Sequence, residues 1–128
     1  MRIGELSRTC GCPVETIRYF EKIGLLPLPL RDANGYRSYD VSHKKWLHFI
    51  LRSRALGFTQ NEVRRLSDLA HQSQAACADV HELLVEHIDD IRKKLEDLQQ
   101  MQRALERLKL KCQDGTLNDC PVIDQLMN

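Results

Sequence analysis

Residues 3–24 read IGELSRTCGCPVETIRYFEKIG, which is the pattern of two short helices separated by a tight turn. In the first helix Ile3 and Leu6 fall on one face, and Gly11 follows where helices commonly end in a left-handed residue. Pro13 suits the first position of the second helix, because its missing N–H costs nothing there. Two such helices joined by a glycine-containing turn predict a helix-turn-helix.

The exposed face of the second predicted helix carries side chains that suit contacts with DNA. Glu15 and Thr16, at its start, are candidates for contacting base edges. Arginine and tyrosine donors contact phosphates and position a protein on the duplex without reading its sequence. The candidates for such contacts are Arg18, Tyr19, Tyr36, Arg37, Tyr39, Arg52 and Arg54. The alternative interpretation is ordinary surface charge, with the tyrosines packing a hairpin.

A hairpin is predicted next, because residues 31–39, RDANGYRSY, centre on the turn pair Asn34-Gly35. A hairpin after a helix-turn-helix is interpreted as a wing, and we use that name below. Asp40 is placed to cap a third helix over residues 41–56. The apolar contacts expected from this helix are Trp46, Leu47, Phe49, Ile50 and Leu56.

A fourth helix opens at the capping-box pattern of Thr59 and Glu62 and is predicted to reach about Ala70. After a polar connector, residues 71–76, apolar residues recur in steps of three and four along residues 78–111, close to the 3.5-residue period of a coiled coil. These positions are Leu84, Ile88, Ile91, Leu95, Leu98, Met101, Leu105, Leu108 and Cys112. Because no other helix remains to cover this stripe, the pattern predicts a homodimer built on a coiled coil. The alternative is an amphipathic helix packed on its own domain.

Three cysteines lie at the two ends of this long segment. If it is one helix, Cys77 and Cys112 are separated by roughly 52 Å, too far to bind one ion or to bridge each other. An antiparallel dimer places Cys77 of one chain beside Cys112 and Cys120 of the other, which creates a three-thiolate pocket twice by symmetry. Soft thiolates favour soft or borderline metals. The alternative is three buried, inert thiols that act as small apolar residues.

The two halves of the chain differ in charge, although the net charge is only +1. Residues 1–70 carry 12 Lys/Arg and 7 Asp/Glu, which suits nucleic acid, whereas residues 71–128 carry 7 and 11. No apolar run is long enough to cross a membrane and no signal peptide is visible, so we expect a cytoplasmic protein. In that reducing compartment, five cysteines favour metal or redox chemistry over disulfides.

The remaining reactive side chains indicate no catalysis. Cys10 and Cys12 lie at the first turn and are interpreted as structural, with Cys12 near a helix N-terminus as a candidate reactive thiol. Neither a nucleophile with its base and acid, nor a Walker loop, nor a dinucleotide fingerprint is present in the sequence, so an enzyme is not predicted.

The segments IGELSRTCGCPVETIRYFEKIGLL, NGYRSY and RALGFTQNEVRRL resemble the MerR family of regulators over essentially the whole chain. The resemblance implies a mainly α fold. A winged helix-turn-helix domain would occupy residues 1–70, a connector and antiparallel coiled-coil dimerisation helix residues 71–111, and a metal-binding loop with a short tail residues 112–128. It also implies a homodimer that binds double-stranded operator DNA and distorts it, so that RNA polymerase engages the promoter.

The resemblance also bears on the metal. Cys112 and Cys120 match the two thiolates of the family's metal-binding loop, and Cys77 matches the cysteine of its sensors for +2 ions. The sequence is most similar to the cadmium/lead branch, although its loop spacing resembles the copper branch. Gln113 stands where zinc sensors usually add a cysteine. We therefore expect Cd²⁺ or Pb²⁺, with Hg²⁺, Zn²⁺ or Cu⁺ as alternatives.

Two other classes of protein fit parts of the sequence. A cytosolic metal buffer or redox sensor would use the thiols, but it needs no DNA-reading half. A small-molecule multidrug regulator of the same family would carry a larger effector domain than residues 120–128 provide.

Overall fold

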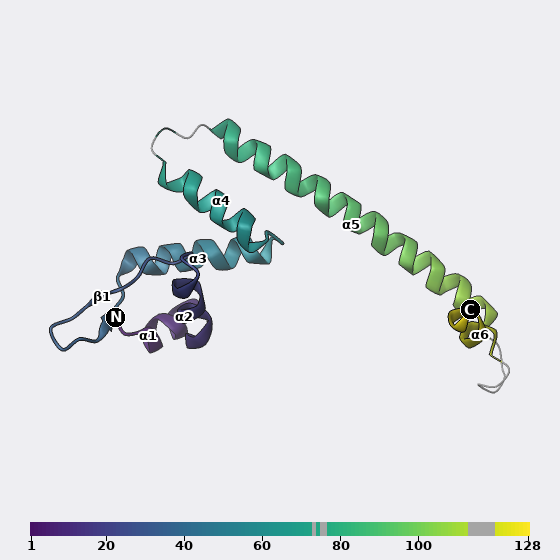
Figure 1. The fold of residues 1–128 in the computed structure, drawn as a ribbon, viewed down its shortest axis with the longest axis horizontal. Coiled ribbons are helices and arrows are strands. Elements are labelled where there is room, and N and C mark those ends of the chain that lie inside the picture. Colours follow the sequence, from purple (N-terminus) through teal and green to yellow (C-terminus); the bar gives the residue numbers. More distant parts are fainter. Residues whose placement is uncertain (73, 75–76, 113–119) are drawn as a thin grey trace. The chain divides into compact units, whose positions relative to one another are not determined.

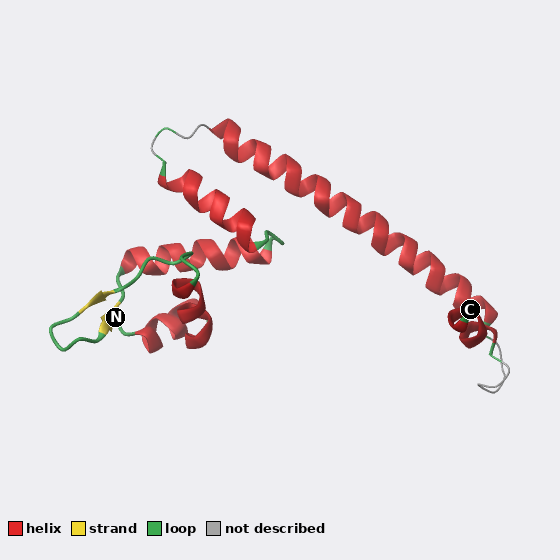
Figure 2. Cartoon of the chain, viewed as in Figure 1, coloured by secondary structure: helices red, strands yellow, loops and turns green. Residues whose placement is uncertain are grey.

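The fold is mainly helical, as the sequence predicts, with one two-stranded antiparallel hairpin (Figure 1, Figure 2). This computed structural model describes residues 1–72, 74, 77–112 and 120–128. The chain divides into two compact units, Met1–Leu83 and Leu84–Asn128. The elements in chain order are α1 (Ile3–Cys10), α2 (Val14–Lys22), β1 (Leu30–Arg31), β2 (Arg37–Ser38), α3 (Val41–Ala55), α4 (Gln60–His71), α5 (Cys77–Lys111) and α6 (Pro121–Met127).

Helices α1 and α2 form the predicted helix-turn-helix. α1 ends at Gly11, whose φ of 65° lies in the left-handed region and whose N–H donates to the carbonyl of Ser7. A side chain at this position would strain the turn, which explains the glycine. Pro13 corrects the prediction by one residue, because it caps α2 instead of forming its first residue, which is Val14.

One apolar core holds α1, α2 and α3 together, with α4 packed on α3. Full burial of one leucine or isoleucine stabilises such a core by roughly 1.5–3 kcal/mol. The buried members are Leu6, Cys12, Ile17, Phe20, Leu25, Leu26, Tyr39, Leu47, Ile50, Phe58 and Val63. Trp46 and Phe49 pack at its edge as expected, but Leu56 is 66% exposed because it lies past the last residue of α3.

The predicted wing is present as the β1–β2 hairpin, in which Leu30 pairs with Ser38 and Arg31 with Arg37. Its turn is longer than the two-residue turn that Asn-Gly most often forms. The N–H of Gly35 donates to Asp32 O at 3.0 Å, and the N–H of Asp32 donates to Tyr36 O at 2.8 Å. Gly35 takes a φ of 80°, which is the three-residue loop with a glycine bulge.

Helices α3 and α4 both begin at their predicted caps. The Asp40 carboxylate accepts a hydrogen bond from the backbone N–H of His43 at 3.1 Å, and this bond lowers the pKa of Asp40. Thr59 and Glu62 form the reciprocal capping box, with bonds of 3.2 and 3.0 Å. These local bonds satisfy N–H groups that a helix start leaves unpaired, and they fix where each helix begins.

The long helix α5 runs without interruption for 35 residues, which corresponds to roughly 52 Å. Its apolar stripe is open to solvent in the chain, with exposed fractions from 37% to 65%. The exposed members are Leu84, Ile88, Ile91, Leu95, Leu98, Met101 and Leu105. α6 returns to the end of α5, where the ammonium group of Lys111 donates to Gln125 Oε1 at 2.8 Å. No helix in the described part of the chain has the length and apolar character needed to cross a membrane.

Three expectations fall wholly or partly outside the described residues. The predicted connector includes residues 73, 75 and 76, and the predicted Asp114-Gly115 turn lies within residues 113–119. Gln113, which bears on the choice of metal, also belongs to the second of these segments.

Candidate nucleic-acid interface and metal centre

Helix α2 presents most of its predicted contact residues to solvent. Glu15 and Arg18 are exposed, whereas Thr16 is half-buried. Tyr19 is 44% exposed, and its hydroxyl accepts a hydrogen bond of 2.8 Å from the side-chain amide of Gln60. α4 therefore fixes Tyr19 on the surface of α2 with the phenolic proton still available for a further acceptor.

The tip of the wing carries an exposed aromatic ring held by a cation. Tyr36 is 61% exposed, and the guanidinium carbon of Arg2 lies 4.5 Å from the centre of its ring. Arg2 also pairs with Asp32 of the turn at 2.9 Å. The N-terminal segment thus braces the wing by a cation–π contact and an ion pair. The sequence prediction did not include Arg2, because only the fold brings residue 2 to the wing.

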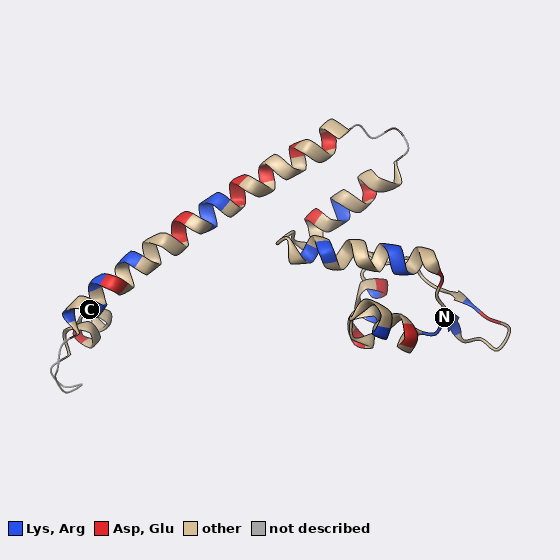
Figure 3. Cartoon of the chain, turned by 180° about the vertical axis from the view of Figure 1, so that it is seen from behind, with Lys and Arg blue, Asp and Glu red and all other residues tan. Residues whose placement is uncertain are grey.

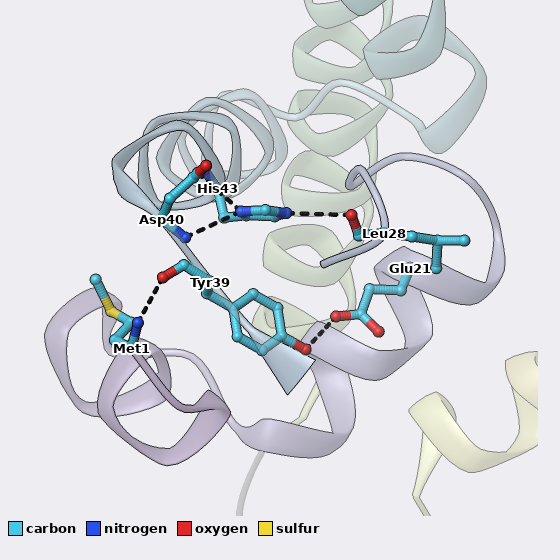
Figure 4. Close-up of polar contacts among 6 residues, drawn as sticks. All are labelled: Met1, Glu21, Leu28, Tyr39, Asp40 and His43. Atoms are coloured by element: carbon cyan, nitrogen blue, oxygen red, sulfur yellow. Dashed lines mark hydrogen bonds and ion pairs between the residues drawn. The ribbon is translucent and has the colours of Figure 1, made fainter. Parts of the chain in front are cut away.

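Arg37 and Tyr39, at the end of the wing, lie in different environments. The Arg37 side chain is 40% exposed, and its Nη1 donates to Glu21 Oε2 at 3.2 Å. Tyr39 is only 2% exposed, and its hydroxyl donates to the other carboxylate oxygen of Glu21 (Figure 4). Burial is the main cause that raises the pKa of Tyr39 to about 12, and the hydrogen bond to the Glu21 carboxylate and its negative charge act in the same direction. Tyr39 is therefore a core residue, which corrects the expectation that it contacts a phosphate.

The structure brings three cations of this unit together around one cavity of about 310 Å³. The cavity is lined by Arg18, Lys22 and Arg37, with Glu21 and Leu28. Lys22 lies in the last turn of α2, and the sequence analysis did not include it. Its spacing of four residues from Arg18, which places both on one face of a helix, was the signal that could have found it. Clustered cations beside a helix-turn-helix suit the phosphate backbone of DNA.

The two arginines predicted on α3 are exposed, but they differ in freedom. Arg54 donates from Nη1 to the carbonyl of Phe58 at 2.8 Å and so closes the end of α3. Arg52 lines an open, mostly apolar cavity of about 540 Å³ along α3, together with Lys44 and Lys45. Arg52 thus stays a candidate contact, whereas Arg54 also serves the fold.

We expect Arg18→Ala and Arg37→Ala each to weaken binding to all DNA sequences alike. Each removes one cation that is a candidate to displace a counterion from a phosphate, so the slope of log K against log salt should become shallower by about one unit. Fluorescence anisotropy of a mixed-sequence duplex across a salt series measures this slope. The matched control is Arg103→Ala, which removes an exposed arginine of α5. Full affinity and an unchanged slope would remove the tested arginine from the interface.

The three candidate metal ligands occupy the ends of helices. Cys77 is the first residue of α5 and is exposed, and Cys112 directly follows the last residue of α5 and is exposed too. Cys120 caps α6 and is half-buried. All three are free thiols in the chain. Within one copy of the chain, the described His, Cys, Asp and Glu side chains include no group of three that could hold one metal ion.

Cys10 and Cys12 lie in packed surroundings, in agreement with their interpretation as structural residues. Cys12 is 2% exposed in the core, and Cys10 lies half-buried with its Sγ 3.9 Å from His48 Nε2. Burial raises the pKa of both thiols, so neither is activated as a thiolate. This corrects the suggestion that the helix N-terminus makes Cys12 reactive.

Comparison with known proteins identifies the family. The family model described as MerR HTH family regulatory protein matches residues 1–69, and the one described as MerR, DNA binding matches residues 45–108. The mercuric resistance operon regulatory protein of Bacillus cereus is 42% identical over 127 residues, covering 98% of this chain and 96% of the relative. The heavy metal-dependent transcription regulator 2 of Rhizobium meliloti (strain 1021) is 36% identical over 128 residues, covering 100% and 87%.

A solved structure matches over the same extent. The transcription regulator PbrR691 from Ralstonia metallidurans CH34, crystallised in complex with lead(II), superposes with a TM-score of 0.89 at 37% identity, covering 98% of both chains. The helix-turn-helix, the long helix and these matches lead to one conclusion. The chain belongs to the MerR family of transcriptional regulators and is one of its metal-responsive members, and the regulators of this family are not enzymes.

Proposed function

We propose that this regulator works as a homodimer that senses a soft divalent ion, Cd²⁺ or Pb²⁺, and activates a metal-resistance promoter by distorting its operator. The observation that carries the proposal is the position of Cys77 and Cys112 at opposite ends of one 35-residue helix. Thiols at opposite ends of one long helix come close to each other when the same helix of a second chain packs beside it in the antiparallel direction.

The apolar stripe of α5 supports the dimer. An amphipathic helix buries its apolar stripe against another element, and the seven exposed stripe residues of α5 repeat with the coiled-coil period. Acidic and basic residues are interspersed along the rest of this helix, which suits a solvated outer face (Figure 3). In an antiparallel pair, Cys77 of one chain would lie beside Cys112 and Cys120 of the other. We accordingly propose three functional regions: residues 1–70 for DNA, 71–111 for dimerisation and 112–128 for metal.

The ligand set favours large soft cations. Three thiolates and one divalent ion carry a net charge of −1, and an all-sulfur trigonal site suits Cd²⁺, Pb²⁺ and Hg²⁺, whereas Zn²⁺ prefers a fourth ligand. The relatives named for mercuric resistance and for a lead(II) complex support a soft divalent ion. Hg²⁺ is therefore the nearest alternative, ahead of Zn²⁺ and Cu⁺.

The metal acts through the shape of bound DNA. Both the metal-free and the metal-loaded dimer would bind the operator, because the helix-turn-helix and wing belong to both forms. The metal can change the outcome only by binding one arrangement of the two DNA-binding domains more tightly than the other. A dimer that twists and bends its operator gains specificity from the deformability of bases it never touches, and the changed shape would let RNA polymerase engage.

The deciding experiment is transcription in vitro from a promoter that contains an operator selected on this protein. Each reaction holds one ion from the panel Cd²⁺, Pb²⁺, Hg²⁺, Zn²⁺ and Cu⁺ at a buffered free concentration. We expect Cd²⁺ or Pb²⁺ to activate at a lower free concentration than Zn²⁺, and Cu⁺ to activate poorly, because Cys77 supplies a third sulfur. A response to Cu⁺ more sensitive than to every divalent ion would overturn the metal assignment.

A further inference from the structure

A buried carboxylate joins the helix-turn-helix to the wing. The Glu21 side chain, in the last turns of α2, is 4% exposed. One of its oxygens accepts from Arg37 Nη1 at 3.2 Å. The other oxygen accepts from the hydroxyl of Tyr39, and Figure 4 shows this second bond. Tyr39 is itself anchored, because its backbone N–H donates to Met1 O at 2.8 Å. Glu21 is thus held from two sides by residues 16 and 18 positions further along the chain.

This carboxylate stands where a negative charge is unfavourable for binding DNA. It lines the same cavity as Arg18, Lys22 and Arg37, which are the cations suited to a phosphate. A carboxylate there repels the phosphate and offsets part of the positive charge. Its presence is explained if it also favours DNA binding in another way, and its bond to Arg37 indicates that it does so by orienting that side chain.

An arginine side chain on a wing has many rotamers, and ordering it on DNA opposes binding. The bond from Nη1 to Glu21 uses one of the five N–H donors of Arg37, and a further side-chain bond joins Arg37 to Tyr39, so donors still remain for an acceptor outside. The Arg37 side chain remains 40% exposed, so the bound rotamer still reaches solvent. The Arg37 side chain is therefore already ordered in the free protein, before DNA binds.

We propose that Glu21 is a positioning residue for DNA binding, which fixes Arg37 in the rotamer that contacts a backbone phosphate, with Tyr39 fixing Glu21 in turn. The proposal rests on the proposed role of Arg37 at the DNA backbone. Glu21 contacts no phosphate itself.

The test is a double-mutant cycle on the full-length protein, with binding to a mixed-sequence duplex measured across a salt series. Glu21→Gln keeps the shape and the acceptor for Tyr39 but loses the charge that holds Arg37. We expect it to weaken binding about fivefold, which corresponds to the net contribution of one typical hydrogen bond. In the Arg37→Ala background the same substitution should not weaken binding further, because there is no arginine left to position.

A purely electrostatic role predicts the opposite sign. If Glu21 only repels phosphates, Glu21→Gln strengthens binding in both backgrounds, and the inference is overturned. Tyr39→Phe provides a second variant, since it deletes one hydroxyl, keeps the core packed and leaves the Arg37–Glu21 pair. We expect a smaller loss of affinity, again only when Arg37 is present, and thermal unfolding of every variant checks the fold. If Glu21→Gln fails to fold, Tyr39→Phe decides alone.

The outcomes separate the two claims. Equal losses with and without Arg37 would show that Glu21 or Tyr39 acts through the fold alone and would overturn the positioning role, leaving the Arg37 contact in place. Unchanged binding by Arg37→Ala itself would overturn the phosphate contact and the positioning role together.

Discussion

Replacing Cys77, Cys112 or Cys120 singly by serine is expected to abolish activation by Cd²⁺ or Pb²⁺ and to leave operator binding intact. In the proposed centre the three thiolates share one ion, and a serine hydroxyl at neutral pH supplies neither the negative charge nor the soft donor that these ions prefer. Operator binding should persist, because the helix-turn-helix and wing contain none of these residues. Transcription at buffered free metal and anisotropy of the operator duplex, measured side by side, separate the two effects.

Cys10→Ser is the matched control for these substitutions. This substitution also changes a thiol to a hydroxyl, but Cys10 lies half-buried in the first unit with His48 as its neighbour. We expect its response to metal to equal that of the unaltered protein. Wild-type activation by Cd²⁺ or Pb²⁺ in Cys77→Ser would contradict the three-thiolate centre and would leave Cys112 and Cys120 as the remaining thiols of the proposed set.

Local signals predicted most of the first unit, because each depends on a few neighbouring residues. Gly11 ends α1 in the left-handed region, and the box of Thr59 and Glu62 opens α4 as expected. Asn34-Gly35 located the wing, although its turn holds one residue more than the simplest hairpin. Chemistry confined to four or five residues decides such features, so a single sequence is sufficient to recognise them.

Tertiary pairing decided what the sequence could not. Tyr39 looked like a surface donor beside Arg37, yet it is buried because its hydroxyl meets Glu21, 18 residues earlier in the chain. Nothing in the periodicity of α2 marks Glu21 as the partner of a tyrosine on the wing. Arg2 and Gln60 were missed for the same reason, since each supports a tyrosine that only the fold brings near. The metal centre proposed above goes one step further, because in that proposal it takes ligands from a second chain.

A mixed dimer tests that last step, and its expected result is a gain of function from two inactive chains. One chain carries Cys77→Ser, and the other carries Cys112→Ser with Cys120→Ser. Each variant alone should form dimers without a complete site. In the mixed dimer, the intact Cys77 of the second chain faces the intact Cys112 and Cys120 of the first, so metal titration of the purified species should find one site per dimer. A count of zero would contradict a shared centre.

The reciprocal pairing removes the remaining ambiguity. An unaltered chain is combined with a chain in which Cys77, Cys112 and Cys120 are all serine. If each site takes ligands from both chains, this dimer has no complete site, because every pocket lacks either Cys77 or the other two thiols. If each site lay within one chain, the unaltered chain would still bind one ion. The two mixed dimers contain the same number of intact cysteines, so only the arrangement of the thiols distinguishes them. Opposite outcomes in the two titrations are therefore expected from the antiparallel placement of α5 and from no arrangement within a single chain.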